Sequence, residues 1–207
     1  MTTPQPSLRE RHRTRTLAEI HQAALDLAGE GGFPETTVDA VAERAGISRR
    51  TFFNYYASKE DALLGITPPR VSESAHARYM DRTTGDEFAR TVRLFMDVLR
   101  DATGPPEFTA RRRELVEHHP ELKRRIGMQV TTVENLVVST VTEQSARGAS
   151  PRSEETSHAF VLLAGSVIKF AFRTDTHLAS VSNDDAAVQH ALDHAIGVFR
   201  TALKEIS

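Results

Sequence analysis

The sequence predicts an all-α protein of about nine helices, with a three-helix N-terminal domain followed by a larger C-terminal helical domain. Three observations support this prediction. Apolar residues recur mainly at three- and four-residue steps, which is the helical period. No Asn-Gly or Asp-Gly pair, the strongest hairpin signal, occurs in the chain. Glycine, proline and capping Ser or Thr residues interrupt the pattern at helix-length intervals.

Composition narrows the class of protein further. The 207 residues are 39% hydrophobic, which is enough for a sizeable core. The absence of cysteine excludes disulfides and thiolate chemistry, and it is compatible with a reducing compartment. Neither a signal-like apolar run nor a stretch of eighteen apolar residues occurs, so we expect a cytoplasmic protein without membrane contact. Because the net charge is −2, any nucleic-acid contact must come from local positive charge.

The first expected helix starts at Thr16, places Leu17, Ile20 and Ala24 on one face, and ends at the glycines 29, 31 and 32. Three short helices follow, each after a capping side chain: Thr37, Ser48 and Ser58. Breakers such as Gly-Pro-Pro and His-Pro then separate longer helices. These are expected near residues 71–82, 86–102, 107–118, 120–147, 153–173 and 184–205.

The segment 37–63 contains two short helices joined by a turn at Ala45-Gly46-Ile47, which is helix-turn-helix spacing. In such a unit the second helix enters the major groove of DNA. Arginine can bond guanine through two N–H groups and asparagine can pair with adenine, so Arg49, Arg50 and Asn54 are candidate base readers. Hydroxyl and ammonium groups nearby can hold phosphates. The predicted DNA-binding residues are Thr37, Ser48, Arg49, Arg50, Thr51, Asn54, Tyr55 and Lys59.

Two further features adjoin this segment. Phe52 and Phe53 are expected to be core residues rather than DNA contacts. Residues 1–13 are expected to form a flexible basic arm, because arginines stand at positions 9, 11, 13 and 15. The arm either reaches a minor groove or phosphates, or remains a frayed tail; the sequence favours neither interpretation.

Residues 14–65 resemble the DNA-binding domain of the TetR family of bacterial repressors. Phe53 replaces the family's usual tyrosine and Tyr56 its usual phenylalanine, so position 53 is assigned to packing alone. The resemblance implies a DNA-binding domain at 1–65 and a ligand-binding and dimerisation domain at 66–207. It also implies a homodimeric repressor that leaves a palindromic operator when a small molecule binds. The positions that match the family pattern are Thr37, Ala42, Ala45, Gly46, Ile47, Ser48, Phe53, Tyr56, Lys59 and Leu63.

The C-terminal helices offer candidates for these two roles. An apolar pocket is expected on inward faces, although for each residue taken singly the sequence favours a core role over a pocket role. The basic segment 111–125 resembles a subgroup that senses acyl-CoA-like ligands, while an ordinary solvated helix face is the alternative. The pocket candidates are Phe95, Leu99, Leu115, Met128, Leu136, Phe160 and Leu163. The dimer-interface candidates are Phe160, Val167, Phe170, Leu192, Ile196 and Phe199.

The remaining classes of function find little support. No nucleophile elbow, Walker loop or dinucleotide-binding loop occurs, so we expect neither an enzyme nor a cofactor. His190 and His194 lie four residues apart but lack a third ligand, and no metal site is predicted. Two alternatives stay open besides the ligand-responsive repressor. One is a related activator or ligand-independent regulator, and the other is a helical small-molecule-binding protein that does not contact DNA.

Overall fold

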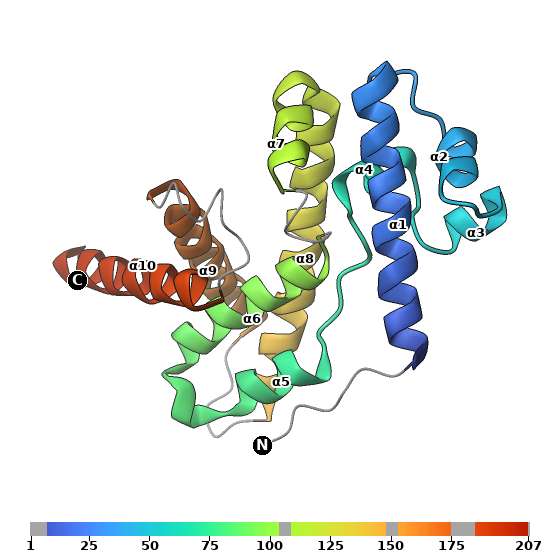
Figure 1. Cartoon of the computed structure of the whole chain (residues 1–207). Helices are drawn as coiled ribbons and strands as arrows, with labels where there is room; N and C mark the ends of the chain where they lie inside the picture. Colours follow the sequence, from blue (N-terminus) through green and yellow to red (C-terminus); the bar gives the residue numbers. More distant parts are fainter. Residues whose placement is uncertain (1–7, 104–108, 148–152, 175–184, 207) are drawn as a thin grey trace. The chain divides into compact units, whose positions relative to one another are not determined.

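The computed structural model describes residues 8–103, 109–147, 153–174 and 185–206 (Figure 1). Within these ranges the chain forms ten α-helices and one short 3₁₀ helix, with no strand, which confirms the all-α prediction. Each α-helix corresponds to one of the helices expected individually from the sequence, so the total is ten rather than about nine. None of the described helices combines the length and apolar composition that a bilayer-spanning helix needs.

The chain divides into two compact units that differ from the expected domains in one respect. The N-terminal unit comprises residues 1–67 together with 103–126, and the C-terminal unit comprises 68–102 and 127–207. The first break falls two residues after the expected boundary at 65. The return of residues 103–126 to the N-terminal unit was not expected from the sequence.

Six helices contribute to the N-terminal unit. The first begins at Leu8 rather than Thr16, so residues 8–13 are helical and the expectation of a flexible arm is wrong for them; residues 1–7 lie outside the described ranges. Neither glycine nor proline separates Leu8 from Thr16, and arginine is a good helix former. The elements are α1 (Leu8–Gly31), α2 (Val38–Arg44), α3 (Arg49–Phe53), α4 (Lys59–Leu64), α7 (Thr109–His118) and the beginning of α8 (Pro120–Ala146).

Local signals define the ends of the three short helices. The side chains of Thr37, Ser48 and Ser58 each accept a bond from the backbone N–H three residues later, at 3.2, 3.0 and 3.1 Å. Each cap satisfies a donor that the first helical turn leaves open. Gly46, after α2, has φ +67°, a conformation that side chains disfavour, and a Cβ there would meet nothing within 4 Å. The backbone angle, rather than space, therefore requires glycine at this turn.

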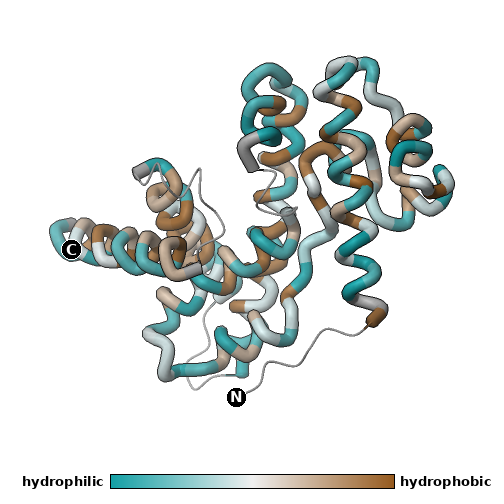
Figure 2. The backbone as a smooth tube through the Cα atoms, in the orientation of Figure 1, coloured by the Kyte–Doolittle hydropathy of each residue, from teal (hydrophilic) through white to brown (hydrophobic). Residues whose placement is uncertain are grey.

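The core of the N-terminal unit lies between α1 and the short helices. Ile20 and Ala24 on α1 are fully buried, and so are Phe52 on α3 and Leu63 on α4. Figure 2 shows hydrophobic segments along α1 and α4. Tyr56 is 2% exposed and donates its hydroxyl to the Leu17 carbonyl oxygen at 3.1 Å, which joins the end of the helix-turn-helix to α1.

Arginines from α7 and α8 bind α1 and α4 within the same unit. Arg125 Nε lies 2.6 Å from Oδ1 of Asp61, whose side chain is 5% exposed. Arg112 donates to the Leu64 carbonyl oxygen at 3.1 Å, and Arg111 donates to Asp26 Oδ1 at 3.0 Å. These contacts explain why residues 103–126 belong with the N-terminal helices.

The C-terminal unit is built around α6 and α9. A Cβ on Gly165 would lie 3.0 Å from Cε1 of Phe95, so glycine permits the close approach of these two helices. Val92, Val98 and Val167 are fully buried in the same core. The elements are α5 (Glu73–Met80), a 3₁₀ helix (Arg82–Thr84), α6 (Glu87–Asp101), α8 from residue 127, α9 (Glu154–Thr174) and α10 (Asp185–Ile206).

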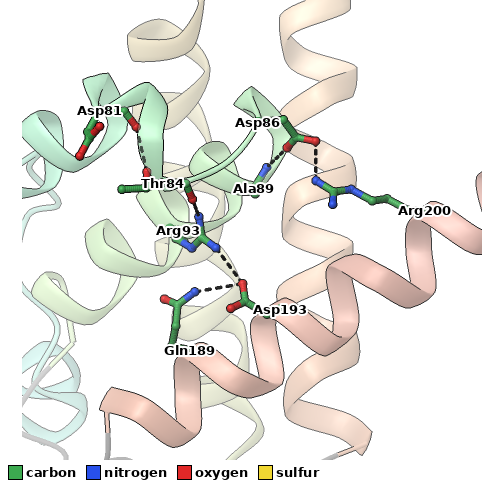
Figure 3. Close-up of polar contacts among 8 residues, drawn as sticks. All are labelled: Asp81, Thr84, Asp86, Ala89, Arg93, Gln189, Asp193 and Arg200. Atoms are coloured by element: carbon green, nitrogen blue, oxygen red, sulfur yellow. Dashed lines mark hydrogen bonds and ion pairs between the residues drawn. The ribbon is translucent and has the colours of Figure 1, made fainter.

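Polar contacts join α10 to α6 at the surface of this unit (Figure 3). Arg93 Nη2 lies 2.8 Å from Asp193 Oδ1, while Arg93 Nη1 donates to the Thr84 carbonyl oxygen at 2.6 Å. Asp86, the N-cap of α6, pairs with Arg200 of α10. Exposed pairs of this kind contribute little free energy, so their main effect is to fix how α10 lies along α6.

The buried Asp61–Arg125 pair predicts a large loss of stability when its cation is removed. Arg125→Met should lower the free energy of unfolding by about 3 kcal/mol, because it leaves a buried carboxylate without its partner. Arg124→Met, a change at the exposed neighbouring position on α8, is the control and should alter stability by less than about 0.5 kcal/mol. Urea unfolding followed by circular dichroism measures both. Equal stabilities of the two variants would show that the pair is not important for the fold.

His21 predicts a second, pH-dependent effect on stability. Its ring is fully buried, with Nδ1 2.6 Å from the Ala62 carbonyl oxygen. Burial lowers the pKa of His21 from 6.5 to about 4; the Ala62 hydrogen bond opposes this shift, and the charges of Arg112 and Arg111 reinforce it. The unfolded chain therefore binds more protons between pH 4 and 6.5. The contribution of neutral His21 is complete above pH 6.5 and is lost as the pH falls towards 4.

In that range the wild-type protein should lose about 3 kcal/mol of stability through this group. His21→Asn should be less stable at pH 7 but should show a flatter dependence on pH between 4 and 6.5. His12→Asn, at an exposed position of α1, should keep the wild-type slope. Denaturant titrations at several pH values test this, and an unchanged slope in His21→Asn would contradict the assignment.

Candidate nucleic-acid interface

The second helix of the helix-turn-helix, α3, has one buried and one exposed side. Phe52 is fully buried beneath it. Arg49, Arg50 and Asn54 are exposed, so the structure brings the three predicted base readers to the solvent side of one short helix. Arginine and asparagine side chains placed in this way can reach base edges in a major groove.

Arg49 is held by two neighbours. Its Nη1 lies 2.8 Å from both carboxylate oxygens of Asp39 in the first turn of α2. Its Cζ lies 5.6 Å from the centre of the Phe53 ring, within the range of a cation–π interaction. The guanidinium is thus ordered before any DNA is present, which reduces the entropy that binding would cost.

The predicted phosphate contacts divide into two groups. Thr37 and Ser48 are exposed and use their hydroxyl oxygens as caps, and Thr51 is half-buried with its hydroxyl 2.8 Å from that of Ser48. Tyr55 is half-buried, with the guanidinium carbon of Arg13 5.5 Å from its ring centre. Arg13 was expected in the basic arm, and its position in α1 places this charge beside the helix-turn-helix.

Lys59 has a different environment from the one expected for a phosphate anchor. Its Nζ donates to the carbonyl oxygens of Phe33 and Pro34 at 3.2 and 3.3 Å, and it lies 4.6 Å from the Phe33 ring centre. The side chain therefore fastens the connector between α1 and α2 to the start of α4. A structural role accounts for this lysine without DNA.

The expectation that two adjacent phenylalanines belong to the core is confirmed for one of them only. Phe52 is a core residue as predicted, but Phe53 is 47% exposed and the prediction of packing is wrong for it. The two rings meet edge to face at 5.4 Å, so Phe53 covers one edge of Phe52 and leaves much of its own surface to solvent. Nothing in the residue pattern indicates this difference, since both residues are apolar and adjacent.

The seven predicted pocket residues fall in two units, and three of them, Phe95, Leu99 and Leu136, belong to one hydrophobic core in the C-terminal unit. Leu115 belongs to the N-terminal unit, where it borders a hollow of about 240 Å³ beside Gly29 and Arg111. The other six belong to the C-terminal unit. Of these, Phe95 is buried, whereas Met128 and Leu163 are 57% and 38% exposed.

Three of the six predicted dimer residues are core residues of a single chain. Val167, Leu192 and Ile196 are at most 3% exposed and cannot contact a second protomer through their side chains. Phe170 and Phe199 meet edge to face within the unit, with ring centres 5.8 Å apart, and Phe160 meets Phe88 in the same way at 5.3 Å. The exposed apolar residues of α9 and α10 are Leu162, Leu163, Val198 and Leu203.

Comparison with known proteins agrees with this geometry. The sequence model described as "Bacterial regulatory proteins, tetR family" matches residues 20–65, which contain the helix-turn-helix. The HTH-type transcriptional regulator TcmR of Streptomyces glaucescens is 41% identical over 59 residues, covering 28% of this chain and 26% of TcmR. The HTH-type transcriptional regulator EthR of Mycolicibacterium smegmatis is 30% identical over 122 residues, covering 58% of this chain and 56% of EthR.

The chain spans between about a quarter and a little over half the length of these two relatives. Among solved structures, Thermus thermophilus FadR, a TetR family transcriptional repressor in complex with lauroyl-CoA, matches with 18% identity and a TM-score of 0.38, covering 88% of this chain and 92% of FadR. The helix-turn-helix and the family match together define a DNA-binding domain. Residues 20–65 are therefore similar to the N-terminal domain of TetR family regulators.

The exposed side of α3 predicts the effect of two substitutions. Arg50→Ala and Asn54→Ala should each relax base preference by roughly 1–3 kcal/mol per lost bidentate contact, while binding to random DNA changes less. Competition binding of each variant to a selected operator and to its point variants measures this. Arg113→Ala, at an exposed arginine of α7, is the control and should leave base preference intact. Equal losses on specific and random DNA would mean that Arg50 and Asn54 do not read bases.

Proposed function

We propose that this protein is a cytoplasmic, homodimeric transcriptional repressor that binds a palindromic operator and releases it when a small ligand binds the C-terminal unit. The observation that carries the proposal is the construction of α3. Its polar side chains Arg49, Arg50 and Asn54 face solvent on a helix that is capped by Ser48 and supported by buried Phe52. The match of residues 20–65 to the TetR family supports DNA as the partner of this surface.

A two-fold dimer is the assembly that suits a DNA-binding surface built on α3. One α3 is a short element with few possible base contacts, and a symmetric pair of them reads a palindrome with half-sites one helical turn apart. Leu162 on α9 and Val198 on α10 are 49% and 37% exposed and supply apolar surface for the second copy. Gly197, with nothing within 4 Å of its Cβ position, leaves room for another helix close to α10.

The chemistry of the proposed ligand is apolar or amphipathic. The basic segment 111–125 offers little support for an acyl-CoA-like head group, because three of its five arginines already have protein partners. Arg111, Arg112 and Arg125 bind Asp26, Leu64 and Asp61 in the N-terminal unit. Ligand and DNA would favour different states of the dimer, with a coupling free energy of roughly 1–3 kcal/mol.

Selection of bound sequences from random duplex DNA tests the proposal. The purified full-length protein should enrich a palindrome, and light scattering should show a dimer both free and on the selected DNA. A variant with Arg49, Arg50 and Asn54 all changed to Ala is the control; it should remain a folded dimer and enrich no sequence. If the wild-type protein, folded and at low salt, also enriches none, DNA recognition is refuted and a helical ligand-binding protein becomes the better interpretation.

A further inference from the structure

Phe53 is an apolar side chain in the middle of a polar recognition surface. It is 47% exposed and lies on α3 with exposed Arg49 and Arg50. A single exposed hydrophobic residue needs no explanation by itself. The position of Phe53 needs an explanation, since a side chain on the exposed side of a helix that enters the major groove meets base edges.

Arg49, Phe53 and Asp39 form one ordered group. The guanidinium carbon of Arg49 lies 5.6 Å from the Phe53 ring centre, and Asp39 fixes Nη1 with two contacts of 2.8 Å. Beyond Nη1, a guanidinium carries further N–H groups on Nε and Nη2 that suit the two acceptors of guanine. The benzyl group beside it has neither donor nor acceptor, so it cannot anchor a phosphate or bond a base edge.

We propose that Phe53 determines specificity by contacting the C5-methyl group of a thymine next to a guanine bound by Arg49. Thymine is the base that presents a methyl group in the major groove, and phenylalanine is among the side chains that contact it. The inference rests on the proposed function, because it names what the reading surface selects. Each half-site of the operator should therefore contain a guanine and an adjacent thymine with its methyl group against the ring.

Replacing single thymines of the selected operator by deoxyuridine tests the contact, because the change removes the methyl group and keeps base pairing. Wild-type protein should bind about fourfold more weakly when one thymine per half-site is replaced, the value expected for losing one buried methyl group (~0.8 kcal/mol). Replacement in both half-sites should cost about sixteenfold. Deoxyuridine at other thymines should have little effect.

Two variants separate the methyl contact from general weakening. Phe53→Ala should bind the thymine and deoxyuridine operators equally, while Phe53→Leu should keep part of the difference because leucine can still contact the methyl group. Arg50→Ala is the matched control on the same helix: it should bind more weakly yet retain the full deoxyuridine penalty. Thermal unfolding of each variant checks that α3 remains folded.

The outcomes distinguish this inference from the function on which it rests. A palindromic operator that is indifferent to deoxyuridine at every thymine overturns the role of Phe53 and leaves sequence-specific binding intact. The same conclusion follows if Phe53→Ala loses as much binding on the deoxyuridine operator as the wild-type protein does. In that case the methyl group contacts another residue or acts through the shape of the DNA. Failure to enrich any operator overturns the proposed function, and the thymine contact with it.

Discussion

Burial of Phe52 and Tyr56 is the constraint on which the recognition surface depends. The helix α3 has five residues, far too few to be stable alone in water. Packing against the core stabilises its conformation, because Phe52 is fully buried and the Tyr56 hydroxyl donates to the Leu17 carbonyl oxygen of α1. Loss of a buried ring of this size typically costs about 3–5 kcal/mol. The exposed arginines keep their geometry only while this aromatic anchor is in place.

Strong local signals explain why the helix-turn-helix could be predicted from the sequence. Thr37, Ser48 and Ser58 cap helices within the same few residues, and Gly46 takes the positive φ that the turn requires. The beginning of α1 was placed too late because apolar spacing starts only at Leu17, whereas good helix formers extend the helix to Leu8. Apolar periodicity indicates a helix face that packs against other elements, and an exposed helix end has no such face.

Contacts that are distant in sequence account for what could not be predicted. Arg111 binds Asp26 from 85 positions away, and no pattern within residues 111–125 indicates that partner. The sequence assigns Val167 and Leu192 to a dimer interface, and both are buried within one chain, because apolar periodicity cannot tell whether the covering surface belongs to the same chain or to a second copy. Phe53 posed a related problem, since a helix of five residues is too short to define its buried side by pattern.

The helix α8 has a consequence for how such proteins can be recombined. Its residues 120–126 belong to the N-terminal unit and 127–146 to the C-terminal unit, so the N-terminal unit is discontinuous in the sequence. A single crossover near residue 67 would replace everything after it by the sequence of another protein. Residues 1–67 would then lack their own Arg125, and the buried Asp61 would lose its counter-ion. An exchange that preserves the N-terminal unit needs three crossovers, at the boundaries 67/68, 102/103 and 126/127, so that residues 103–126 stay with their original partners.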